Sequence, residues 1–106
     1  MSAAKGANPL RGEAELRIDG GVHVLRPSFA ALVAAEAELG PLFALVERAA
    51  DGRLALGELA TLFWHCLHDR PERLTREGVG EAVVVQGLAA VTPALRVLLG
   101  QILQGR

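Results

Sequence analysis

The chain has 106 residues, of which 51% are hydrophobic and 22% charged, a balance that excludes a disordered protein and allows one domain. Its formal net charge of −1 comes from interleaved acidic and basic residues, without the basic stripe typical of nucleic-acid binding. One cysteine excludes an internal disulfide, the first residues do not resemble a signal peptide, and no apolar run approaches the roughly 20 residues that cross a bilayer, so we expect a soluble cytoplasmic domain without membrane contacts.

The N-terminal region is predicted to be a flexible tail followed by a β-hairpin. Residues 1–10 form the tail, and a single domain is expected over 11–106. Hydrophobic and charged residues alternate over 13–18, which is the period of a half-buried strand. Asp19-Gly20-Gly21 supplies residues that accept positive φ, as a tight hairpin turn requires. Because a hairpin alone is not stable, its apolar face must pack on helices.

Three short helices are predicted after the hairpin. The first has Ser28 as its N-cap and ends at Gly40, and the second begins near Pro41. The first is expected to bury a stripe made of Phe29, Leu32, Val33, Glu36 and Leu39. The second carries its stripe on Leu42, Leu45, Val46 and Ala49. The third is predicted at about 57–68, with an inward stripe of Leu59, Leu62, Phe63, Cys66 and Leu67.

The C-terminal third is predicted to hold one or two more helices. Thr75 is a suitable N-cap, but Gly78, Gly80 and three consecutive valines leave open whether 77–86 is a helix or a buried strand. Thr92-Pro93 is a suitable start for a last helix, whose apolar face would be Leu95, Leu98, Leu99 and Ile102. The predicted fold class is therefore α+β, mostly α, with an N-terminal β-hairpin packed on four to five short helices.

The stretch "FWHC", followed by His68, concentrates the side chains most often used in chemistry. Helical spacing places Cys66 on the buried stripe, where a thiol is inert, and turns it away from His65 and His68. Zinc needs three or four converging ligands, and two histidines at i, i+3 spacing supply only part of a site. We therefore predict neither a metal site nor a nucleophilic cysteine here, and expect the two histidines at the solvent edge.

Trp64 and Glu36 are the remaining unusual positions. Trp64 lies at the rim of the apolar stripe, where it either packs half-buried or anchors a partner. Glu36 is predicted to make a structural polar contact, accepting amides at a neighbouring helix start or pairing with an arginine. Glu38 lies about 160° round the same helix and does not complete a catalytic pair with Glu36. The arginines of 70–76 alternate with acidic residues and are expected to form a solvated loop.

Apolar residues exceed what one face of each C-terminal helix can bury. Val84 and Val85 fall outside the side covered by Val79 and Val83, and Val97 and Leu103 broaden the last helix's stripe. Exposed apolar surface commonly marks a protein contact, although the hairpin is an alternative cover. The predicted partner-binding residues are Trp64, Val84, Val85, Val97 and Leu103.

The order of these elements resembles the gene-transfer-agent and phage tail family whose members are labelled tail assembly chaperone or tail tube protein. The resemblance rests on "RGEAELRIDGGVHVLRPSFAALVAAEAELG", with its Asp-Gly hairpin turn and its helix ending in Glu-x-x-x-Gly. It continues through "PLFALVERAADGRLALGELATLFWHCLHD" and "LTREGVGEAVVVQGL" to the last leucine-rich helix, covering roughly 11–104.

This resemblance implies a non-enzymatic protein of tail morphogenesis in a bacterial cytoplasm, without cofactors. As a tail assembly chaperone it would bind apolar helical segments of the tape-measure protein, or another tail protein, with a homo-oligomer also open. A structural tube component is the alternative, ranked second because one short hairpin offers few sheet edges for closing a ring. A small metal-binding or enzymatic domain using His65, His68 and Glu36 is the third reading.

Overall fold

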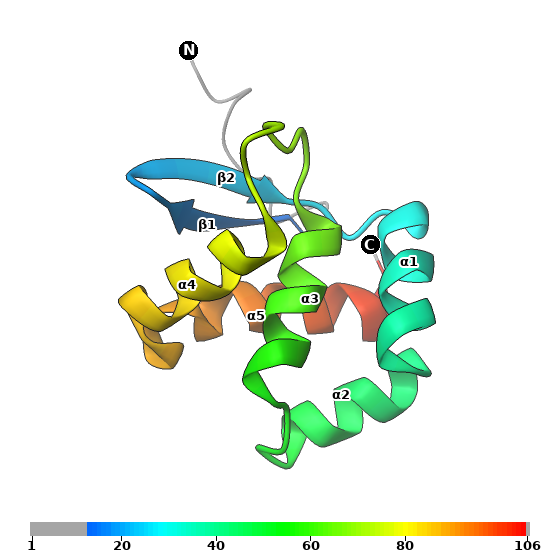
Figure 1. Cartoon of the computed structure of the whole chain (residues 1–106). Coiled ribbons are helices and arrows are strands. Elements are labelled where there is room, and N and C mark those ends of the chain that lie inside the picture. The colour runs from blue at the N-terminus through cyan, green and yellow to red at the C-terminus, as the bar shows by residue number, and fades with distance from the viewer. Residues whose placement is uncertain (1–12, 106) are drawn as a thin grey trace.

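The computed structural model describes residues 13–105 and has a two-stranded hairpin followed by five helices (Figure 1). The elements are β1 (Ala14–Ile18), β2 (Gly21–Leu25), α1 (Phe29–Leu39), α2 (Leu42–Ala50), α3 (Leu56–Cys66), α4 (Arg76–Gln86) and α5 (Leu88–Gln104). The predicted fold class, a hairpin on several short helices, is confirmed. The tail predicted at 1–10 lies outside the described residues.

The hairpin forms where the alternation of residue types predicts it. β1 and β2 are antiparallel and pair Ile18 with Gly21, so the connecting loop is Asp19-Gly20. Both loop residues have positive φ, 51° and 80°, as the tightest hairpin turns require. The inward-facing residues of β1 are almost fully buried against the helices. These residues are Ala14, Leu16 and Ile18.

The chain leaving α3 runs along the outer edge of β2. Leu25 and Leu67 form an isolated antiparallel bridge. Around it, Arg26 N donates to Cys66 O at 2.6 Å and His68 N donates to Val24 O at 2.9 Å. Arg26 also donates from Nε to the buried carboxylate of Glu13 at 2.6 Å, fixing the start of β1. The hairpin is therefore attached to α3 by backbone hydrogen bonds as well as by its apolar face.

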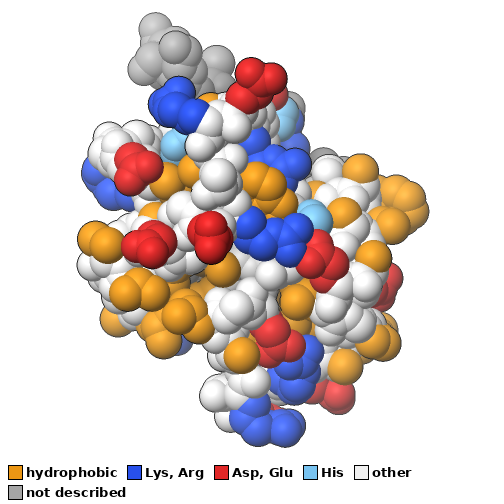
Figure 2. Space-filling view, in the orientation of Figure 1, with side chains coloured by type: hydrophobic (Ala, Val, Ile, Leu, Met, Phe, Trp, Pro, Cys, Tyr) orange, Lys and Arg blue, Asp and Glu red, His pale blue; other side chains and the backbone are white. Residues whose placement is uncertain are grey.

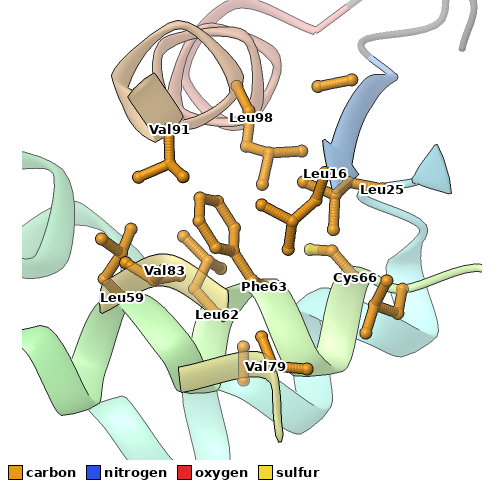
Figure 3. Close-up of a cluster of buried hydrophobic side chains, with 14 of the residues drawn as sticks. Leu16, Leu25, Leu59, Leu62, Phe63, Cys66, Val79, Val83, Val91 and Leu98 are labelled. Carbon is orange, nitrogen blue, oxygen red and sulfur yellow. The ribbon is translucent and has the colours of Figure 1, made fainter. Parts of the chain in front are cut away.

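Helix α3 lies at the centre of the helical layer, between α1 and α4, and contributes more buried residues to the core than any other element (Figures 1 and 3). Its predicted inward stripe is confirmed, and Leu62 and Phe63 have no exposed surface. Figure 3 shows Phe63 pointing into a cluster shared with β1, β2, α4 and α5. The other labelled members of this cluster are Leu16, Leu25, Leu59, Leu62, Cys66, Val79, Val83, Val91 and Leu98.

The rotation of α1 differs from the prediction. Phe29 is 86% exposed and Val33 is 49% exposed, whereas Ala35 is fully buried. Helix α1 is apolar around most of its circumference, so its hydrophobic pattern does not select one face. The small Ala35 side chain allows close packing against α3. An ion pair from Glu38 to Arg76 on α4 fixes the same rotation. Of the predicted stripe, Leu32 and Leu39 pack against the core, whereas the inward position predicted for Phe29, Val33 and Glu36 was wrong.

The C-terminal third forms two helices, α4 and α5, so the segment 77–86 is a helix and not a strand. Residues 76–86 are helical, and Thr75 caps them by accepting a hydrogen bond from Gly78 N at 3.0 Å. Helix α5 begins at Leu88, four residues before the predicted start, and includes Pro93. Proline lacks an N–H, so this turn loses one helical hydrogen bond. The residues before Pro93 nevertheless remain helical, because this conformation buries Val91 in the core.

Within 13–105, no single helix is long and apolar enough to span a membrane, and α1 with α2 reaches that length and composition only as a pair bent by 75°.

Candidate functional site

Cys66 is buried inside the core and is not part of a reactive centre. The residue is 1% exposed and lies among apolar side chains of β1, β2 and α3 (Figure 3). Burial raises the pKa of its thiol from 9.0 to about 12, because the thiolate would lose its hydration. The nucleophile would therefore be absent at neutral pH. The buried position predicted for this cysteine is confirmed.

His65 in α3 and His68 just after the C-terminal end of that helix face different partners. His65 Nε2 lies 2.5 Å from Glu38 Oε2. His68 instead lies beside Arg26 Nη1, which is 3.2 Å from its ring nitrogens, and beside Asp69. Across the described part of the chain, no group of three or more His, Cys, Asp or Glu side chains is placed to hold a metal ion. His65 and His68 therefore do not share a ligand position.

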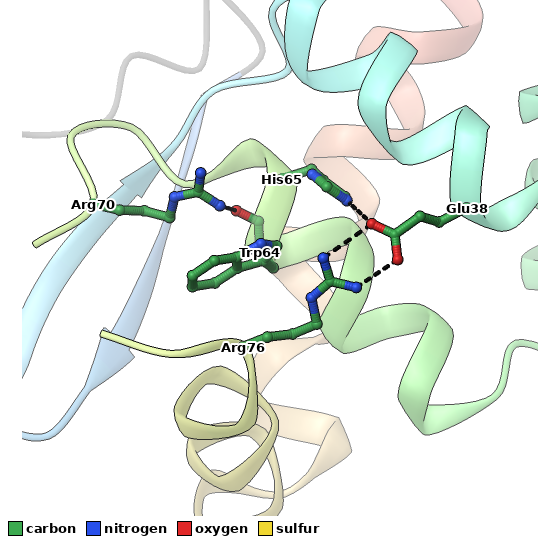
Figure 4. A network of polar contacts seen from close by, with 5 residues as sticks. All are labelled: Glu38, Trp64, His65, Arg70 and Arg76. Atoms are coloured by element: carbon green, nitrogen blue, oxygen red, sulfur yellow. Dashed lines mark hydrogen bonds and ion pairs between the residues drawn. The ribbon is translucent and has the colours of Figure 1, made fainter. Parts of the chain in front are cut away.

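Glu38 joins three helices through charged contacts that the sequence did not reveal (Figure 4). Arg76 donates to both of its oxygens, at 2.5 Å and 3.0 Å, and His65 approaches from α3. The hydrogen bonds from Arg76 and His65 lower the pKa of the Glu38 carboxyl from 4.5 to about 2. These partners are 38 and 27 residues away in sequence, so no local pattern marks them. The cluster ties α1, α3 and α4 together.

Trp64 lies under two arginines and does not present an open apolar face. The Arg70 guanidinium carbon is 4.0 Å from the indole centroid, and that of Arg76 is 5.9 Å away. Arg70 also donates to Trp64 O at 3.1 Å (Figure 4). Cation–π contact of this kind holds the ring and both arginines in place. Arg70 and Arg76 are exposed, as expected of a solvated segment, but both also contact the Trp64 ring, and Arg76 is the first residue of α4 and not part of a loop.

Glu36 is exposed, contrary to its predicted place inside the α1 stripe. Its Oε2 accepts a hydrogen bond from Leu42 N at 3.1 Å, at the first turn of α2. A carboxylate at this position satisfies a free helix amide and interacts favourably with the helix dipole. Glu36 thus links the end of α1 to the start of α2.

Val84 and Val85 stand on the outer side of α4 and are 63% and 83% exposed. Leu88, the first residue of α5, is 58% exposed and follows directly after the Gly87 turn. We call these three residues the α4–α5 corner. Figure 2 shows hydrophobic atoms gathered at the lower left, over α4 and the start of α5.

The predicted partner-binding residues do not form one surface. Val97 is half-buried and packs on the core, beside a hollow that it shares with Ala14 and Glu15. Leu103 is 54% exposed but lies near the opposite end of α5. At a rise of ~1.5 Å per residue, it is about 22 Å along the helix from Leu88. Only Val84 and Val85 among the five are neighbours at the α4–α5 corner.

A second apolar surface lies where the start of α2 meets the end of α5. A hollow of about 210 Å³ is lined there entirely by apolar side chains. Phe43, at its rim, is 78% exposed. Phe43 was not among the residues predicted to bind a partner, although its place outside the stripe of Leu42, Leu45 and Val46 indicates that it is exposed. The remaining lining residues are Leu42, Val46, Ile102 and Leu103.

Residues 11–105 match the protein family described as "Phage tail tube protein, GTA-gp10". Because this match covers nearly the whole chain, the protein belongs to that family, and it is a tail-related protein of phages and gene transfer agents. The predicted family resemblance is confirmed. Families of tail structure and assembly are generally non-enzymatic, and their members interact with other tail proteins. No curated protein and no solved structure matches the chain.

Proposed function

We propose that this protein is a tail assembly chaperone that binds apolar helical segments of the tape-measure protein in the cytoplasm of its bacterial host. Such a chaperone would keep the long apolar helix of its partner in solution while the tail is built. The proposal adds a specific role to the family membership, which concerns tails in general. Its binding surface is the α4–α5 corner.

The exposed aliphatic side chains of this corner are the observation that carries the proposal. Val84, Val85 and Leu88 expose more than half of their surfaces at adjoining positions of two helices. Contiguous exposed apolar side chains usually mark a protein contact. A surface formed by two helices suits the apolar stripe of a third, which contacts it through residues spaced at i, i+3 and i+4.

A structural tube component is the second candidate, favoured by the family's description as a tail tube protein. The two functions differ in whether the protein remains in the finished tail. Mass spectrometry of purified particles separates them, because a chaperone is absent from finished tails and a tube subunit is present in many copies. We rank the chaperone first because a single hairpin is the only sheet in the described residues and offers little for a β-sheet ring.

Co-expression with the tape-measure protein encoded by the same gene cluster tests the proposal directly. The informative variant is Val84→Lys with Val85→Lys, which removes the apolar surface at little cost to the fold. Both residues lie near the C-terminal end of α4, where the last turn has no basic residue. Lysine is tolerated there because a positive charge interacts favourably with the C-terminal end of the helix dipole. Phe43→Gln, at the other exposed surface, is the matched control.

The native chain should raise the soluble yield of the tape-measure protein and co-purify with it. The double lysine variant should lose both effects while keeping the native circular dichroism spectrum, and Phe43→Gln should retain them. No gain in solubility with the native chain, or full binding by the lysine variant, would contradict the proposal.

A further inference from the structure

A cavity lies between the tip of the hairpin and the segment that joins α3 to α4. The chain leaving α3 follows β2 as far as His68, whose N–H donates to Val24 O, and Asp69 then turns away with a φ of 54°. The segment returns to the start of α4 beside the hairpin (Figure 1). Residues of 18–23 and of 71–78 enclose a space of about 290 Å³, which we call the hairpin-tip cavity.

Part of the hairpin-tip cavity is apolar. Ile18, which is 3% exposed, extends the core to its wall, and Leu74 and Pro71 are half-buried on the side of the joining segment. Gly21 adds no side chain, so the space beside the hairpin turn stays open. The volume is close to the lower end of small-ligand sites, ~300 Å³, which suits one or two amino-acid residues. The apolar wall favours burial of an aliphatic side chain there.

The polar groups of the cavity are mostly hydrogen-bond donors. Arg73 is exposed at its rim, and His23 is half-buried on β2. Thr75 Oγ1 accepts a hydrogen bond from Gly78 N at 3.0 Å, so its hydroxyl hydrogen can still donate to a bound molecule. Asp19, in the hairpin turn, is the carboxylate among the described lining residues. The matching molecule has a carboxylate for the donors and an N–H for Asp19.

We propose that the hairpin-tip cavity binds the C-terminal residue of a partner chain that ends in an aliphatic amino acid. The free α-carboxylate pairs with Arg73 and accepts from Thr75, and the aliphatic side chain lies against Ile18 and Leu74. The amide N–H of the same residue donates to Asp19. Only at a chain end do a carboxylate and an aliphatic side chain belong to one residue, and capture of a terminal carboxylate is a recurring mode of peptide recognition.

This site is separate from the α4–α5 corner. The cavity adjoins the first residues of α4, whereas Val84 and Val85 lie near its last. At a rise of ~1.5 Å per residue, Gly78 and Val85 are about 10 Å apart along the helix. Binding of a chain end is therefore independent of the tape-measure proposal, and either can fail without the other.

Titration of the isotopically labelled full chain with the peptide acetyl-Gly-Ser-Gly-Leu, followed by NMR, tests the proposal. The amide signals of Gly21, Val22 and Gly78 should shift with a dissociation constant of about 1 mM, because a single residue supplies few contacts. The same peptide with a C-terminal amide should bind about tenfold more weakly, since it lacks the charge that pairs with Arg73.

Two variants change the cavity in different ways. Arg73→Gln should weaken peptide binding about tenfold, whereas Arg96→Gln, the same substitution at an exposed position of α5, should leave it unchanged. Gly21→Val keeps every charge but fills the open side of the cavity. Its Cβ atom would lie 3.5 Å from Ile18 O and 3.6 Å from His23 Nε2, which are ordinary contacts, and its side chain should also weaken binding. Circular dichroism checks that each variant is folded.

Unshifted signals at these three amides with about 10 mM peptide, well above the expected dissociation constant, would overturn the inference. So would equal binding of the amidated peptide, because the carboxylate would then play no part. If sodium acetate moved the same signals at the same concentrations, the cavity would take any free carboxylate and the assignment to a chain end would be wrong. Loss of tape-measure binding by the double lysine variant is a separate result that concerns the α4–α5 corner alone.

Discussion

Gly100 and Gly87 provide a paired test of how backbone conformation limits stability. A Cβ atom added at either glycine would meet no heavy atom within 4 Å. Gly100 lies inside α5 with ordinary helical dihedrals, whereas Gly87 joins α4 to α5 with φ of 90° and ψ of 149°. Substitution by alanine therefore changes the backbone cost at each site without a steric clash.

Gly100→Ala should stabilise the protein by about 0.8–1 kcal/mol, the difference in helix propensity between the two residues. Gly87→Ala should destabilise it by about 1–3 kcal/mol, because a side chain is strained in this region of φ and ψ. In a domain of about 100 residues, 1 kcal/mol corresponds to about 4–8 °C in Tm. The two variants should therefore shift Tm in opposite directions.

Thermal unfolding followed by circular dichroism, with urea titrations to obtain free energies of unfolding, measures both variants. The slope of the free energy against urea should be the same as in the native chain, since neither substitution changes the surface exposed on unfolding. A lower Tm for Gly100→Ala would refute the helix-propensity argument, and a Gly87→Ala variant as stable as the native chain would refute the strain assigned to the α4–α5 junction.

Two further predictions concern Cys66 and Glu38. Because burial raises the pKa of the Cys66 thiol to about 12, Ellman's reagent at pH 7.4 should label the chain only after guanidinium unfolds it, and rapid labelling of the folded chain would contradict this burial. The folded-state pKa of Glu38 lies near 2, below its ordinary 4.5, so its contribution to stability is present above pH 4.5 and is lost as the pH falls toward 2. The free energy of unfolding of the native chain should therefore fall more steeply over this range than that of Glu38→Gln, and parallel curves would show that the Arg76 and His65 contacts do not stabilise the fold.

The hairpin and α3 could be predicted from sequence because their signals are local. The alternation of β1 and the Asp19-Gly20 turn specify the strands and their register within a dozen residues. The large apolar residues of α3 gather on one side of the helix around Phe63, so the sequence indicates a single face for burial.

The rotation of α1 and the start of α5 could not be predicted in the same way. The apolar residues of α1 surround the helix, and the contact that orients it joins Glu38 to Arg76, 38 residues away. In α5, Pro93 is a strong local signal for a helix start, but burial of Val91 outweighs the lost hydrogen bond. Tertiary contacts decided both cases.

The candidate surfaces were predicted only in part. Val84 and Val85 follow from helical spacing, because the buried positions of α4 exclude them. The apolar hollow between α2 and α5 depends on residues more than 50 positions apart in the sequence, such as Val46 and Ile102, and it exists only once the two helices pack. Sequence spacing identifies which side chains a helix leaves outside, but not which of them become neighbours.

Both long sides of the hairpin are already engaged by the protein's own atoms. Leu67 bridges to the outer side of β2, and Gln86 donates to Arg17 O on the outer side of β1 at 2.6 Å. Unprotected strands recruit other chains and lead to fibrous aggregates. The hairpin is thus protected against irreversible strand-to-strand growth with other chains, and association of this protein with others is left to its exposed side chains.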